Sequence, residues 1–530
     1  MEGSMTIRRV CVAGVWLAGA LGAARGQGYG AGSAPQAPAQ VQGSAVDANG
    51  TRLETMSKLL METQRQLEAT QQQLNQLRSE LEAMRGKEAA VSSGGASSSQ
   101  GGAVPAGTLA EKVDHQQEEL EVLQAEVKQH DQTKLESVSK YPVRVYGLML
   151  FNAYSNAGVV DDADLPSAAI QRTPDLSHGS VGATFRQTLF GLSATGPRVF
   201  GARTSADLSV DFFGGSSYSY YATTNGSVRL RRADIRLGWG DRAEDTSVSR
   251  DEVHLGIDAP LISPLSPTSY ATVAMPALAW SGNLWTWAPQ LRYSHRFAIS
   301  NDHPERNLQV EGGLWDPPVV GYAGSTAGRV LSAGEISRRP GFLGRVSAHG
   351  GSSAHPFSFG VGGYSDRQTF YEGQQIQMWA VTSDLQVPIS RRFQLEGEIY
   401  RGRGLGGLGG GAYKDVLTGL DKVTGEQRSV GLNAVGGWVQ WKTHLTGNTE
   451  ANLMYGQDGG FARDFRTLNL TGSTYALEQS ARTQMIVANV IYRPKTYLIF
   501  SPEYRRILSW KATGPAANAN IYTLSLGYQF

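Results

Sequence analysis

The sequence predicts an all-β fold, a 16-stranded antiparallel transmembrane β-barrel preceded by an N-terminal coiled-coil segment. Three observations predict it. The chain begins with a secretion signal and contains no later apolar run long enough for a transmembrane helix. From Tyr141 onward, apolar and polar residues alternate with a period of two. The connections between the alternating segments are mostly short at one end and long at the other.

Composition agrees with a turn-rich β protein. The 530 residues include 64 glycines and 21 prolines, and tyrosine and tryptophan are well represented. Lysine and arginine number 48 against 47 aspartates and glutamates, so the net charge is close to zero. We therefore expect no nucleic acid among the partners.

Residues 1–26 are predicted to form a signal peptide. Arg8 and Arg9 precede an apolar run that ends near Leu21, and small residues follow. A membrane-anchoring helix is the alternative, although the run is shorter than the roughly 20 residues that a span needs. The only cysteine, Cys11, lies in this segment, so the mature chain is expected to have no disulfide and no cysteine metal site.

The next segment is expected to hold two helical stretches. Residues 27–50 are a flexible linker by composition, residues 51–90 a coiled coil, residues 91–107 a Gly/Ser-rich linker and residues 108–140 a second coiled-coil helix. The first helix is indicated by leucines repeating every seven residues: Leu53, Leu60, Leu67, Leu74 and Leu81. The second carries a more polar seam through Leu109, Val113, Leu120, Leu123 and Val127. We interpret the seams as sites of self-association in the periplasm. A lone helix and a tether to the cell wall or another envelope protein are the alternatives.

Residues 141–530 are predicted to form the barrel. In RTSADLSVDF, for example, Leu208 and Val210 alternate with Asp207 and Asp211. Charged residues are costly against lipid, so the polar set is expected to face a wet interior. The strands are expected at about 143–154, 181–192, 203–213, 227–239, 252–258, 289–299, 307–315, 340–349, 356–365, 377–387, 392–401, 434–443, 448–456, 482–493, 496–506 and 520–530.

The connections indicate an orientation. The links NDHPER, PISR and HLTG are tight, whereas residues 155–180, 259–288 and 402–433 form long loops. Outer-membrane barrels have short turns on the periplasmic side, which would place both chain ends there. The last strand, IYTLSLGYQF, ends on Phe530 and is expected to pair with the first strand. A secreted soluble β-sandwich is the rival fold.

Four segments resemble the DcaP-like family of trimeric outer-membrane porins: FRQTLFGLSATG (185–196), VDFFGG (210–215), VRLRRADIRLG (228–238) and APQLRYSHRF (288–297). Phosphate-selective porins share part of this pattern, and later strands match only in alternation. The resemblance implies a homotrimer in the outer membrane, in contact with its lipid and lipopolysaccharide, that admits small hydrophilic solutes and favours anions. The terminal LGYQF looks like the signal read by the barrel-assembly machinery, which would bind the strand ending in Phe530.

Alternation places a set of charged residues in the predicted lumen. The candidate pore-lining residues are Arg186, Arg203, Asp207, Asp211, Arg232, Arg236, Arg292, Arg296 and Arg345. Arginine favours anions in pores and grips carboxylate or phosphate with two hydrogen bonds. The alternative is that each arginine pairs with an acid on a neighbouring strand and only stiffens the wall.

Two connections have unusual compositions. Residues 259–288 are rich in proline and apolar side chains, and we expect this loop either to fold into the lumen as a constriction or to pack at a subunit contact. Residues 401–411 contain Gly402, Gly404 and Gly407 in the spacing of a nucleotide-binding loop, but no helix pattern follows. We interpret this run as a flexible extracellular loop.

The sequence predicts a passive channel and no enzyme. The nine histidines form no HExxH motif, and no GxSxG motif occurs. We expect no cofactor and no metal. The predicted function is that of an outer-membrane porin for small hydrophilic solutes, with its N-terminal segment in the periplasm. The rival is a structural or adhesive envelope protein whose barrel is an anchor.

Overall fold

The computed structural model describes residues 142–174, 178–215, 226–240, 250–299, 305–316, 318, 331–352, 355–370, 373–469 and 480–530. The predicted signal peptide, linkers and coiled-coil segments, residues 1–140, lie outside the described residues. No helix in the described part of the chain is both long enough and apolar enough to cross a bilayer.

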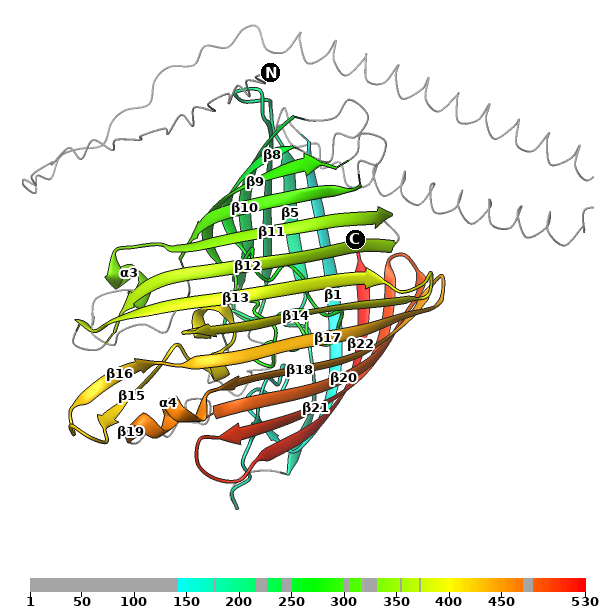
Figure 1. Cartoon of the computed structure of the whole chain (residues 1–530). Helices are drawn as coiled ribbons and strands as arrows, with labels where there is room; N and C mark the ends of the chain where they lie inside the picture. The colour runs from blue at the N-terminus through cyan, green and yellow to red at the C-terminus, as the bar shows by residue number, and fades with distance from the viewer. Residues whose placement is uncertain are drawn as a thin grey trace, which may run out of the picture. The chain divides into compact units, whose positions relative to one another are not determined.

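Most of the described strands belong to one large antiparallel sheet, and two small sheets of three and two strands lie in the connections (Figure 1). The large sheet contains 17 strands, of which β4 and β5 together make one interrupted spanning strand, so 16 strands span the wall as predicted. The strands are β1 (Val143–Ala157), β4 (Gly179–Thr184), β5 (Leu189–Thr195), β6 (Arg203–Asp211), β7 (Arg229–Trp239), β8 (Asp251–Asp258), β9 (Ala288–Ala298), β10 (Asn307–Trp315), β11 (Gly341–Ser352), β12 (His355–Thr369), β13 (Gln375–Pro388), β14 (Phe393–Arg403), β17 (Asn433–Thr446), β18 (Thr449–Gly460), β20 (Ser480–Lys495), β21 (Leu498–Lys511) and β22 (Ala517–Gln529).

The sheet closes on itself. Strand β1 pairs with β22 along one edge and with β4 and β5 along the other, so the described sheet has no free edge. Phe530 completes the seam, because its backbone N–H donates to Gly147 and its carbonyl accepts the Gly147 N–H at 2.8 Å. The chain end is thus part of the wall, and a soluble β-sandwich is not the fold.

The two faces of the wall meet different surroundings. On the outer face, Ile399 is 66% exposed, Val381 54% and Tyr522 54%. On the inner face of the same part of the wall, Asp384 and Glu398 are only 1% and 5% exposed. An apolar exterior around a polar interior is the arrangement of a membrane barrel, so the period-two pattern predicted the faces correctly.

The two rims differ as the connection lengths predicted (Figure 1). At the short-turn rim, β17 joins β18 through residues 447–448, and β20 joins β21 through residues 496–497. The remaining elements belong to the long connections. They are β2 (Val159–Val160), β3 (Ala169–Ile170), α3 (Ala333–Ser337), η2 (Gly406–Leu408), η3 (Gly411–Tyr413), β15 (Val416–Asp421), β16 (Gln427–Gly431), α4 (Ala462–Thr467) and β19 (Leu468–Asn469).

The second spanning strand differs from its prediction as a continuous strand. It breaks between Thr184 and Leu189, where Thr188 donates its backbone N–H to Phe185 at 2.9 Å. The break turns the buried Gln187 side chain toward the interior, where it contacts the loop that follows β8. Residues 185–188 make no strand pairing with β1, and Gln187 instead bonds to the loop of residues 259–287.

Candidate functional site: the barrel lumen

The loop of residues 259–287 folds into the barrel. It crosses the interior and bonds to inward-facing side chains of several strands. Thr382 on β13 donates to the carbonyl of Ile262 at 2.7 Å, and Glu398 on β14 accepts the N–H of Leu265 at 2.8 Å. Further bonds join the loop to Gln440, Glu503 and Gln187. Of the two sequence expectations for this segment, the structure shows the loop inside the lumen.

A second loop, residues 404–415, joins the first. The backbone N–H of Trp285 donates to the carbonyl of Leu408 at 2.9 Å, and the Thr286 hydroxyl donates to the carbonyl of Gly407 at 2.7 Å. Trp280 stacks on Tyr413 with 4.8 Å between ring centroids. Residues 404–412 are all buried. The interpretation of this glycine-rich run as a flexible extracellular loop was therefore wrong, because its glycines permit close packing against tryptophan.

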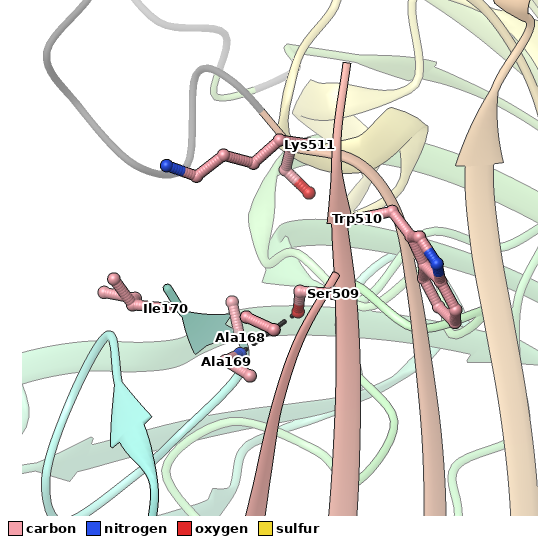
Figure 2. A pocket seen from close by; sticks show the side chains of 8 residues that line it. Ala168, Ala169, Ile170, Ser509, Trp510 and Lys511 are labelled. Carbon is pink, nitrogen blue, oxygen red and sulfur yellow. Dashed lines mark hydrogen bonds between the residues drawn. The ribbon is translucent and has the colours of Figure 1, made fainter. Parts of the chain in front are cut away.

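The described part of the first loop, residues 158–174, also reaches the inner wall. Arg505 on β21 donates to the carbonyl of Pro166 at 3.0 Å, and Ser509 accepts the N–H of Ala169 at 3.1 Å. Figure 2 shows the small hollow at this contact, where Ala169 and Ile170 approach Ser509 and Lys511 at the long-loop rim. The loop thus narrows the entrance on this side.

Two apolar clusters fill much of the interior. One joins the two inner loops to β11–β14 and includes Ile262, Leu284 and Leu408. The other joins Ala277 and Leu278 to β17, β18 and β20–β22. The first cluster also includes Ala288 on β9 and Trp315 on β10. Elsewhere in the interior, a polar side with partly exposed charged side chains lies along β7–β9.

An ionic ladder lines this polar side, on β7, β8 and β9. Asp234 accepts from Arg236 at 2.8 Å and from His254 at 2.8 Å. Asp258 accepts from Arg232 at 3.0 Å and from Arg292 at 3.2 Å. Arg232, Arg236 and Arg292, all predicted from alternation, are thus brought together around two aspartates that link the strands.

Exposure within the ladder is uneven. The side chains of Arg232 and Arg236 are 36% and 34% exposed, whereas that of Asp234 is 1% exposed and that of Asp258 16%. The carboxylates lie behind the guanidinium groups. Interior water therefore meets positive charge first, although every arginine of the ladder has an acidic partner.

The remaining predicted residues occupy other places. Arg186 is buried and pairs with Asp164 of the first loop at 3.0 Å. Arg345 is buried between Asp384 and Glu311, at 2.8 and 3.0 Å. Asp207 accepts the Tyr146 hydroxyl at 2.8 Å. Arg203 and Arg296 lie half-buried on the inner faces of β6 and β9. Arg345 pairs with Glu311 on the neighbouring strand β10, as the cross-strand alternative describes, whereas the partner of Arg186 lies in a loop.

Sequence reasoning missed Arg229 and Arg231. Strict alternation from Arg232 would turn both toward lipid, but the pairing of β6 with β7 shifts by one residue between Ser209 and Val210. This bulge brings both arginines inside. Arg229 bonds Asp211 at 2.6 Å, and Arg231 lies 4.6 Å from the Trp287 ring centre. The sequence did contain a signal for this bulge. Arg229, Arg231 and Arg232 lie within four consecutive positions, so strict alternation would direct at least one of them toward lipid.

Asp234, His254 and Asp258 are close enough to share a metal ion, with ligand atoms within 4.8 Å of one another. Their carboxylates are already held by Arg232, Arg236 and Arg292. A cation would have to enter beside three guanidinium groups, so Coulomb repulsion opposes binding. The group fits an ionic ladder better than a metal centre.

The fold resembles that of solved outer-membrane proteins. No family model and no curated protein matches the sequence. The outer membrane channel DcaP of Acinetobacter baumannii superposes with a TM-score of 0.54 at 17% identity, over 74% of this chain and 99% of that one. An anion-selective porin from Comamonas acidovorans gives 0.46 at 12% identity over 74% and 100% of the two chains. OprB of Pseudomonas putida gives 0.43 at 12% identity over 73% and 94%.

Proposed function

We propose that this protein is an outer-membrane porin, a passive channel for small hydrophilic solutes that favours anions such as carboxylates. The observation that carries the proposal is the exposure of Arg232 and Arg236 in front of Asp234. A solute in the passage meets guanidinium groups, and a narrow passage with low-dielectric walls strengthens their field. The DcaP-like fold supports the same function.

The proposal includes an orientation and an assembly. The long-loop rim faces the outside of the cell, and the short-turn rim, with residues 27–140, faces the periplasm after the signal peptide is cleaved. We further propose a homotrimer whose coiled-coil segments associate in the periplasm, and assembly through recognition of the strand that ends in Phe530.

Selectivity is tested by reversal potentials in planar bilayers under a KCl gradient. We expect anion selectivity for the wild-type channel. The double variant R232Q/R236Q should bring the anion-to-cation permeability ratio close to one, because it removes two exposed positive charges and leaves Asp234 and Asp258 in place.

The matched control is Arg367→Gln, which removes an arginine from the outer face of β12. It should leave the reversal potential unchanged. A cation-selective wild-type channel, or equal shifts in the control and the double variant, would contradict the proposal.

The rival function is that of an envelope anchor, in which the two apolar clusters seal the barrel. Proteoliposomes that contain the full chain distinguish the two functions. A porin swells the vesicles in isosmotic sugar or dicarboxylate, whereas a sealed anchor gives the rate of empty vesicles.

A further inference from the structure

The outer face of the wall carries a second set of arginines near the long-loop rim. They are Arg367 on β12, Arg401 and Arg403 on β14, Arg482 on β20 and Arg506 on β21, and together we call them the arginine belt. Their neighbours two residues away on the same face include Ile399 and Leu508. Strand alternation therefore directs the belt away from the lumen.

The belt has no acidic counterpart on its own face. Every aspartate and glutamate of the spanning strands from β12 to β21 lies on the inner face: Asp366, Asp384, Glu396, Glu398, Glu450, Asp458 and Glu503. Arg367, Arg482 and Arg506 are exposed, and no carboxylate of the described residues lies within salt-bridge distance of them. On this part of the wall the carboxylates thus lie on the inner face, and the exposed arginines of the outer face have no carboxylate partner among the described residues.

Aromatic rings hold part of the belt flat against the wall. The guanidinium carbon of Arg482 lies 3.8 Å from the ring centre of Trp510, and that of Arg401 lies 4.3 Å from the ring centre of Phe461. The N–H groups of Arg401 already donate to Gly402, Ala434 and Asn433, so the exposed Arg482 is the stacked guanidinium whose N–H edge can match two oxygens of a phosphate. The geometry suits an anion that approaches from the side of the membrane.

The belt lies at the depth of lipid headgroups and just below them. Arg482 is two residues from the start of β20 at the rim, and Arg506 is five residues from the end of β21. A tilted strand descends roughly 2.3 Å per residue, so Arg506 lies roughly 12 Å below the end of its strand. Apolar Leu508 and Ile486 lie beside it on the outer face. An occupant must combine anionic groups with hydrocarbon.

We propose that the arginine belt binds the phosphate groups of a phosphorylated lipid in the leaflet at the long-loop rim, which is the outer leaflet in the orientation proposed above. The lipid supplies the negative charge that the outer face of β12–β21 lacks, and its acyl chains cover the apolar residues below. Arg482 and Arg506 are the central contacts, because both are exposed and lie on neighbouring strands.

The test is native mass spectrometry of the full chain in detergent, titrated with bis-phosphorylated lipid A, monophosphorylated lipid A or phosphatidylethanolamine. We expect the bis-phosphorylated lipid to bind most tightly. The variant R482Q/R506Q should bind it about tenfold more weakly, since two charge-assisted contacts are lost. Binding of phosphatidylethanolamine should not change.

The matched control is R391Q/R392Q, which removes two exposed arginines from the turn after β13 at the opposite rim and should bind lipid A as the wild type does. Equal lipid A affinity in R482Q/R506Q and the wild type overturns the proposal. So does a smaller oligomer of R482Q/R506Q without added lipid, because that result assigns the face to a contact between copies. Conductance is measured separately, so a barrel that binds lipid A but does not conduct refutes the channel and not the lipid site.

Discussion

Gly409 shows why the glycine-rich loop of residues 404–415 is closely packed and not flexible. Its φ of 98° lies in the region that glycine adopts without strain, and a Cβ at this position would lie 2.6 Å from Cδ1 of Trp285. The contact joins the two inner loops, because Trp285 and Gly409 belong to different ones. A single hydrogen atom at this position therefore helps to determine how narrow the lumen is.

Gly409→Ala should loosen the two loops and raise single-channel conductance and current noise. Gly425→Ala is the matched control, since Gly425 has a φ of 72° and open space where the Cβ would lie. Both variants bear the cost of a left-handed alanine, on the order of 1 kcal/mol, but only the first also collides with a ring. Equal conductance in the two variants would show that the contact does not set the constriction.

Asp415 makes the packing of the second loop sensitive to pH. Burial raises the pKa of its carboxyl from the ordinary 3.8 to about 6, against the opposing effect of the Gly407 and Gly406 N–H groups, and nearby Asp366 raises it further. Between about pH 4 and pH 6 the folded chain thus binds more protons at this site than the unfolded chain. Stability falls as the pH rises through that window, by a total on the order of 3 kcal/mol.

Asp415→Asn should remove this contribution and retain an oxygen that accepts the Gly407 N–H. Thermal unfolding in detergent, followed by circular dichroism at about pH 4.5 and about pH 7.5, measures it. We expect the wild type to lose more stability than the variant between the two pH values. The same pH dependence in both proteins would rule out Asp415 as the source.

At the scale of elements, strands were predictable and inner loops were not. Each strand carries its own period-two pattern, which is visible without knowledge of its neighbours. The position of residues 259–287 depends instead on partners far along the chain, such as Glu398 for Leu265 and Asn489 for Thr268. The bulge that turns Arg229 and Arg231 inward likewise depends on pairing with β6, which local alternation does not encode.

Replacing residues 264–283 by a short glycine-serine linker should raise single-channel conductance severalfold, because the loop crosses the interior. The freed side chains Glu398, Gln440 and Glu503 would then meet water. The control replaces residues 422–426, the tip of the β15–β16 hairpin at the rim, by glycine and serine. If conductance stays unchanged in the first variant, the loop does not limit the passage.

For the whole molecule, closure decides whether the polar backbone can lie in a membrane at all. An open sheet would present unpaired N–H and carbonyl groups to hydrocarbon, at several kcal/mol each. The β1–β22 seam removes this cost, yet its strands are separated by almost the full described length of the chain. The sequence indicated the seam only through the last strand. There the alternation of apolar and polar residues continues as far as Phe530, which lies on the apolar face.

The seam can be tested with cysteines, because Cys11 lies in the predicted signal peptide and the rest of the sequence contains no other. Phe151 on β1 pairs with Leu526 on β22, so the variant F151C/L526C should form a disulfide on oxidation of the folded protein. In F151C/Y522C the second cysteine lies four residues further along the same face, roughly 13 Å away, beyond the reach of a disulfide. The bond would close a very large ring and speed migration of the denatured, unreduced chain in electrophoresis. Equal cross-linking in both variants would mean that β1 and β22 slide past each other, and no cross-linking in either would mean that the barrel is open.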